Sequence, residues 1–104
     1  MEPSKRDWKL FRDKIGTWQE NYMGKLVIKY TMLLNDKLLA SSKFWELEKQ
    51  IKQDKKKPGV MLNLCKQEMV FDIVRLINDK AITMDDLEEF SDELRDYVKY
   101  LQER

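Results

Sequence analysis

The sequence predicts an all-α protein, a compact bundle of four helices with a long first helix. Two observations support this fold class. Apolar residues recur at alternating steps of three and four in separate stretches of the chain, which is the periodicity of amphipathic helices. Three Gly and two Pro among 104 residues indicate long regular elements with short connections. With 42% hydrophobic and 38% charged residues, the chain suits a single domain, residues 1–104.

A first helix is expected over residues 4–34, with Ser4 as its N-cap. Gly16 and Gly24 interrupt it. Either a long packed helix tolerates these glycines, or they allow another helix to approach closely. The apolar residues of this stretch form one stripe along the helix, namely Trp8, Phe11, Ile15, Trp18, Tyr22, Leu26, Tyr30 and Leu33.

A second helix is expected over residues 42–54, capped by Ser41 or Ser42 and ended before Pro58 and Gly59. Phe44, Leu47 and Ile51 give it one apolar face. Since an amphipathic helix usually turns such a face toward the core, Leu47 and Ile51 are expected to be buried.

A third helix is expected over residues 60–78, with an apolar arc wide enough to contact two or more neighbours. A fourth is expected over residues 83–102, where Thr83 and Asp86 have the spacing of a capping box. The third and fourth helices are expected to bury Leu62, Cys65, Met69, Ile73, Leu76, Leu87, Phe90, Leu94, Tyr97 and Leu101. The first is expected to bury Trp8, Phe11, Ile15, Trp18, Tyr22 and Leu26.

The residue types that build common catalytic and metal centres are scarce. The chain has no His and a single Cys, Cys65, which cannot form the usual zinc sites or an activated thiol nucleophile. Cys65 is expected to be a buried structural thiol. The acidic residues 85–96 are expected to form a solvated surface that favours the start of the fourth helix. We therefore expect no enzymatic activity, no metal and no cofactor.

The C-terminal half of the first helix carries more apolar surface than one packing face requires. Met23, Val27 and Leu34 form a second stripe, turned roughly 100° from the first. Another helix of the same chain could cover this stripe, or a second chain could. We favour a protein–protein interaction module that forms a homodimer through the residues Met23, Gly24, Val27, Ile28, Tyr30 and Leu34, with Gly24 permitting close approach.

Nucleic-acid binding is the alternative function. The two halves of the chain differ in charge: residues 1–59 carry 14 Lys/Arg and 8 Asp/Glu, whereas residues 60–104 carry 6 and 11. A basic cluster in the first half could contact phosphates through Lys49, Lys52, Lys55, Lys56 and Lys57. The near-neutral total charge and the absence of interleaved aromatics place this alternative second.

Two segments resemble parts of a family of small uncharacterised helical proteins from low-GC Gram-positive bacteria. They are residues 42–60, which read SKFWELEKQIKQDKKKPGV, and residues 82–94, which read ITMDDLEEFSDEL. Residues 18–22, WQENY, extend the resemblance. The resemblance implies a bacterial cytoplasmic origin and supplies no activity, ligand or site residue. The lone Cys and the lack of a signal peptide or a long apolar run also favour the cytoplasm, without membrane insertion.

Overall fold

The computed structural model describes residues 2–104 and contains no strand in that part of the chain. Its α-helices are α1 (Lys5–Leu34), α2 (Ala40–Asp54), α3 (Met69–Asn78) and α4 (Asp92–Gln102). Two 3₁₀ turns precede α3 and α4, namely η1 (Lys66–Glu68) and η2 (Met84–Leu87). The all-α class and the long first helix of 30 residues are therefore confirmed.

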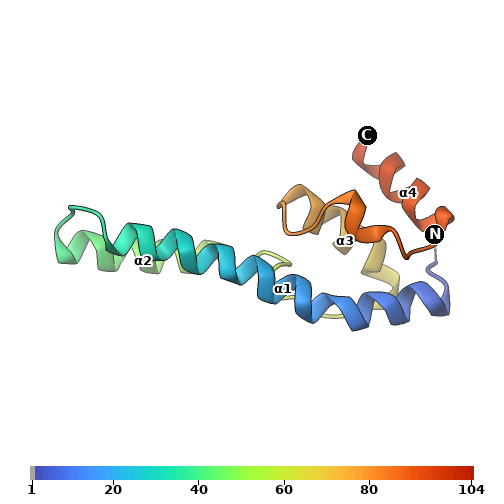
Figure 1. Cartoon of the computed structure of the whole chain (residues 1–104), viewed down its shortest axis with the longest axis horizontal. Helices are drawn as coiled ribbons and strands as arrows, with labels where there is room; N and C mark the ends of the chain where they lie inside the picture. The colour runs from blue at the N-terminus through green and yellow to red at the C-terminus, as the bar shows by residue number, and fades with distance from the viewer. Residues whose placement is uncertain (1) are drawn as a thin grey trace.

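The molecule is extended, and in this respect the predicted compact bundle is wrong. The C-terminal half of α1 and the whole of α2 run antiparallel and project beyond the other helices (Figure 1). The principal extents are 51 × 26 × 20 Å and the radius of gyration is 16.3 Å, against about 13 Å for a compact chain of 100 residues. We call residues 22–54, with the loop between the two helices, the α1–α2 hairpin.

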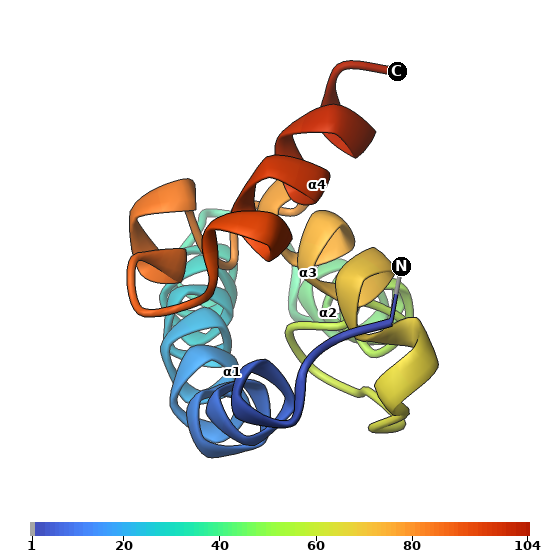
Figure 2. The same ribbon diagram turned by 90° about the vertical axis from the view of Figure 1, so that its right-hand side faces the viewer.

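The hydrophobic core lies at the opposite end of the molecule from the hairpin loop. There α3 and α4 lie against the N-terminal half of α1 (Figure 2). The molecule is extended because this core engages only that half of α1. The buried residues of the core are Phe11, Ile15, Trp18, Met69, Val70, Ile73, Leu76, Ile82, Leu87, Phe90, Leu94 and Val98.

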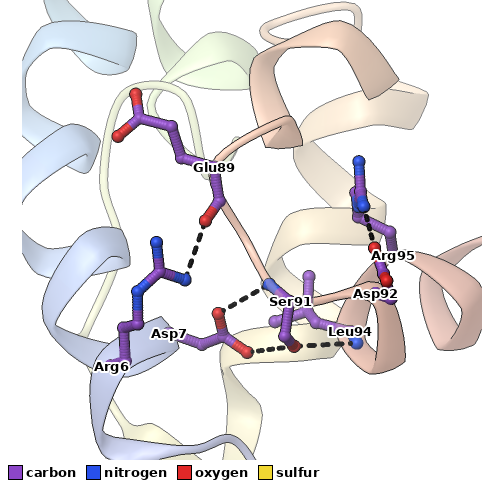
Figure 3. A network of polar contacts seen from close by, with 7 residues as sticks. All are labelled: Arg6, Asp7, Glu89, Ser91, Asp92, Leu94 and Arg95. Atoms are coloured by element: carbon purple, nitrogen blue, oxygen red, sulfur yellow. Dashed lines mark hydrogen bonds and ion pairs between the residues drawn. The ribbon is translucent and has the colours of Figure 1, made fainter.

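Polar contacts fasten the start of α1 to the start of α4 (Figure 3). The Asp7 carboxylate, only 1% exposed, accepts hydrogen bonds from the Ser91 amide at 3.0 Å and the Ser91 hydroxyl at 2.6 Å. The same hydroxyl accepts from the Leu94 amide and so caps α4. Arg6 adds a bond to the Glu89 carbonyl at 2.9 Å, and Arg95 pairs with Asp92 within α4. These contacts hold the N-terminal end of α1 in the core. The hairpin takes no part in them.

The predicted helix boundaries hold for α1 but not for all elements. Ser4 caps α1 as predicted, accepting from the Asp7 amide at 3.1 Å. The second helix begins at Ala40 after Leu39, which makes no side-chain cap, so the prediction that Ser41 or Ser42 caps it is wrong. The capping box of Thr83 and Asp86 is present, but it closes η2 instead of starting a long helix.

The third and fourth helices are shorter than predicted. Residues 61–65 are not helical, and α3 begins only at Met69. An extended residue advances about 3.3 Å and a helical one about 1.5 Å, so this segment carries the chain from the hairpin back to the core. The predicted helix over residues 83–102 is likewise divided, because Ser91 caps a new helix after η2.

Most of the predicted core residues are buried. In full agreement are Phe11, Ile15, Trp18, Tyr22, Met69, Ile73, Leu76, Leu87, Phe90 and Leu94. Partly buried are Trp8, Leu26, Leu47, Leu62, Cys65, Tyr97 and Leu101. The prediction for Ile51 is wrong, because this side chain is exposed on α2. Cys65 is not fully buried, since it lies at the end of the extended segment before η1.

Candidate protein-interaction surface

Exposed apolar side chains are concentrated on the α1–α2 hairpin. Of the thirteen large hydrophobic residues that are exposed in the described chain, nine belong to it. Contiguous apolar surface on a monomer marks an interaction site when it exceeds a few hundred Å². The nine are Val27, Ile28, Met32, Leu34, Leu38, Leu39, Phe44, Trp45 and Ile51.

The residues predicted for a homodimer interface fall into two groups. Val27 and Ile28 are 60% and 63% exposed, and Leu34 is exposed as well. No atom of another element lies within 4 Å of a Cβ placed on Gly24, so this position is open to approach. Met23 and Tyr30 are partly buried within the chain's own hairpin. The helices of the same chain thus cover part of the second stripe and leave the rest in solvent.

The orientation of α2 differs from the prediction. Its polar side faces α1: Lys43 donates from Nζ to the Leu34 carbonyl at 2.8 Å, and Asp54 is buried against α1. Gln50 also turns inward, and its Oε1 is buried with no hydrogen-bond partner. Phe44 and Ile51, on the apolar side, are exposed instead. The apolar face of α2 is therefore left partly in solvent, with Phe44 the most exposed of its residues and Leu47 partly buried.

Two adjoining hollows follow this apolar face. The first, which we call the α2 hollow, is a shallow open depression along one face of α2 alone, of about 330 Å³, and is lined by Phe44, Leu47, Glu48, Ile51, Lys52 and Lys55. The second, which we call the inter-helix hollow, has a volume of about 210 Å³ and is lined by Met23, Leu26, Val27, Tyr30, Ile51, Asp54, Lys55 and Val60. Ile51 and Lys55 belong to both linings, so the hollows adjoin at these two side chains, and we call the pair the groove.

A buried carboxylate ties α2 to α1 beneath this groove. Asp54 is 4% exposed. Its Oδ2 accepts from the Tyr30 hydroxyl at 2.5 Å and from Lys29 Nζ at 3.0 Å. Lys57 Nζ lies 3.4 Å from the other carboxylate oxygen. These contacts hold Tyr30 in place and shape the floor of the inter-helix hollow.

The electrostatics of this cluster favour an ionised Asp54. Burial by itself raises the pKa of the Asp54 carboxyl, but hydrogen bonds from Tyr30 and Lys29 outweigh it, so the pKa lies below its ordinary value. Burial, together with the hydrogen bond to Asp54, raises the pKa of Tyr30 to about 12. Tyr30 therefore stays a neutral hydrogen-bond donor at physiological pH.

Phe44 stands at the outer edge of the groove. It is 63% exposed, and its ring packs edge-on against Trp45 with ring centroids 5.0 Å apart. Such a pair fixes the ring orientation while leaving most of its surface in solvent. This apolar face was visible in the sequence but was expected to pack into the core. On the opposite face lie the polar residues Lys43, Glu46, Gln50 and Asp54. Nothing in the sequence indicated that this polar face would lie against another helix.

The five lysines predicted as possible phosphate contacts do not form an uninterrupted basic surface. Lys57 is paired with Asp54, and Lys52 lies 3.9 Å from Glu48. Lys49, Lys55 and Lys56 are exposed near the end of α2. Lys56 and Lys57, with Arg75, also line a hollow of about 300 Å³ that Asp79 shares. Carboxylates are therefore interspersed with the cations.

Nothing in the described residues assembles a metal centre: no three or more His, Cys, Asp or Glu side chains there come together in a suitable group. Among the predicted solvated acidic residues, Glu89 pairs with Lys14 at 2.9 Å and Asp92 pairs with Arg95.

None of the helices in residues 2–104 combines the length and apolar character that crossing a membrane requires.

Comparison of the chain with known protein families, curated proteins and solved structures gave no match.

Proposed function

We propose that this protein is a non-catalytic helical interaction module that binds protein and associates with a second copy of itself. The observation that carries the proposal is the orientation of α2, which leaves Phe44 and Ile51 of its apolar face exposed beside the exposed Val27 of α1. Leaving apolar area in water is unfavourable by about 25 cal/mol per Å². A two-fold dimer covers equivalent patches on both chains at once.

The test is the mass in solution. We expect static light scattering on the purified chain to give a dimer mass at about 100 µM protein in moderate salt, since dimer formation depends on concentration. A monomer mass under these conditions would refute self-association. Val27→Glu should convert the dimer to a folded monomer, because Val27 is 60% exposed in the single chain. Loss of the helical circular dichroism spectrum instead would place Val27 in the monomer's own core.

Nucleic-acid binding is the second proposal, supported by the exposed Lys49, Lys55 and Lys56. It ranks below protein binding because Asp54 and Glu48 pair with two of the neighbouring lysines. If it holds, affinity should fall steeply with salt, and replacing Lys55, Lys56 and Lys57 together should flatten that dependence. Submicromolar binding to DNA or RNA at physiological salt would reverse our ranking.

We place the protein in the cytoplasm of a bacterium, as the sequence resemblance implies. The free thiol of Cys65 supports a reducing compartment, because this single cysteine has no partner for an internal disulfide. The proposal includes no metal, no cofactor and no catalytic step.

A further inference from the structure

The groove formed by the α2 hollow and the inter-helix hollow has a protruding aromatic ring at one end and an apolar depression at the other. Phe44 stands at the first end. The inter-helix hollow, whose lining includes the apolar Met23, Leu26 and Val27 of α1, lies past Ile51 at the second. A cavity of about 150 Å³ is known to accept a benzene molecule. The inter-helix hollow, at about 210 Å³, therefore has room for a phenylalanine ring.

The charges on the exposed edge of α2 have a complementary order. Glu48 and Lys55 both line the α2 hollow. They are seven residues apart, two turns or about 10.5 Å along one face. When two such edges meet antiparallel, each Glu48 lies opposite the partner's Lys55. When they meet parallel, like charges face each other, which is unfavourable. Lys52 lines the same hollow, and in either orientation the two copies of Lys52 lie near each other. The antiparallel orientation is therefore the less repulsive of the two, because it alone places Glu48 opposite Lys55.

We propose that two copies dock groove to groove with their α2 helices antiparallel, each inserting Phe44 into the inter-helix hollow of the other. This arrangement rests on the proposed self-association and specifies its geometry. A two-fold axis passes close to Ile51, because that residue lies near the midpoint between Glu48 and Lys55. In a two-fold interface, a contact from Glu48 to the partner's Lys55 requires the reciprocal contact.

The same alignment gives part of the remaining exposed apolar surface a partner. Past Phe44, the hairpin loop presents Leu38 and Leu39. Past Lys55, the chain continues into the segment after α2, where Met61 and Leu64 are exposed. The antiparallel pairing carries the loop of one copy toward this segment of the other. Of the residues predicted for the interface, Met23, Val27 and Tyr30 line the receiving hollow, whereas Gly24, Ile28 and Leu34 do not.

The first experiment compares two exposed phenylalanines by sedimentation equilibrium. Phe44→Ala should raise the dimer dissociation constant at least about 100-fold, because a two-fold dimer loses the ring twice. Phe71→Ala is the matched control, since Phe71 is also exposed but lies on α3, outside the groove. We expect it to leave the constant within about twofold. An unchanged constant for Phe44→Ala, with a wild-type dimer, would refute this arrangement while leaving self-association standing.

The second experiment exchanges charges. Glu48→Lys and Lys55→Glu should each weaken self-association about tenfold, because each sets like charges against each other twice per dimer. An equimolar mixture of the two variants should recover wild-type affinity as a heterodimer. In the mixed pair, the lysine introduced in one variant faces the glutamate introduced in the other, and the unchanged Lys55 faces the unchanged Glu48.

Recovery on mixing also shows that both variants fold. If the wild type is a dimer but mixing the two variants does not restore its affinity, the antiparallel pairing is excluded. A wild-type monomer would refute both this arrangement and the self-association on which it rests.

Discussion

The Asp7 carboxylate accepts hydrogen bonds from both the amide and the hydroxyl of Ser91, 84 residues further along the chain. Ser91 is also the N-cap of α4. One serine thus connects the cap of the last helix to the first turn of the first helix (Figure 3). Since Asp7 is almost fully buried, these donors replace the hydrogen bonds that its carboxyl group would otherwise make with water.

We predict that Asp7→Ala lowers the free energy of unfolding by roughly 1.5–3 kcal/mol, the usual loss for hydrogen bonds to a charged group. Urea denaturation followed by circular dichroism measures this change. A double-mutant cycle with Ser91→Ala should show coupling of about 0.5–3 kcal/mol. Strictly additive losses would mean that the two residues act independently.

Phe90 tests the assignment of the core. It is 3% exposed, and its ring centroid lies 6.2 Å from that of Trp18. Phe90→Ala should cost about 3–5 kcal/mol of stability, as large-to-small changes of buried aromatics do. A loss below about 1 kcal/mol in chemical denaturation would show that this face is not the packed one.

The glycines should respond to alanine in opposite directions. A Cβ on Gly59 would lie 2.5 Å from a ring carbon of Tyr22, so Gly59→Ala forces apart the buried contact between the post-α2 segment and α1. We expect a loss of about 1–3 kcal/mol, the range for overpacking. Gly16→Ala meets nothing within 4 Å in mid-helix and should raise stability by up to about 1 kcal/mol. Thermal unfolding of both variants beside the wild type shows whether each substitution raises or lowers the stability.

Acid should weaken the attachment of α2 through Asp54. Because the pKa of Asp54 is lowered in the folded protein, its contribution is present above the unfolded pKa of about 3.9 and is lost as pH falls through the folded value. Asp54→Asn should therefore be less stable than the wild type at pH 7, with a shallower decline in acid. Urea denaturation at a series of pH values from neutral downward measures both effects.

Asp72 serves as a control for Asp54, because its pKa is shifted in the opposite direction. Burial raises its pKa, despite the opposing charge of Arg75, and its Oδ2 is buried without a hydrogen-bond partner. The ionised form is thus disfavoured in the folded state, and lowering the pH relieves this cost. Asp72→Asn should gain stability at pH 7 and show a steeper decline in acid. The same direction of change in both variants would contradict our assignment of the two carboxyl groups.

The periodicity and capping residues in the sequence correctly predicted the core, where helices pack by burying their apolar stripes. The stripe through Phe11, Ile15 and Trp18 is buried as its periodicity indicates, and Ser4 caps α1. The prediction failed at residues 60–68, where an apolar composition favours a helix but the chain must span the distance from the hairpin to the core. Composition carries no information on that distance.

The candidate site was predictable only in part. Excess apolar surface around Val27 was visible in the sequence, and the structure leaves Val27 exposed. The outward orientation of Phe44 and Ile51 was not visible, because periodicity identifies an apolar face without saying what covers it. The polar contacts of Asp54 and Lys43 with α1 decide the orientation of α2, and such long-range pairs have no sequence signature here.

Since α1 is one continuous helix shared by the core and the hairpin, its amide protons should not exchange with solvent at a uniform rate. Amides around Ile15 and Trp18 lie in the core and should exchange only through global unfolding. Amides beyond Lys29 depend on α2 alone for tertiary support and should exchange through smaller local openings. If the hairpin docks on a second copy, this gradient along a single helix should flatten as the protein concentration rises.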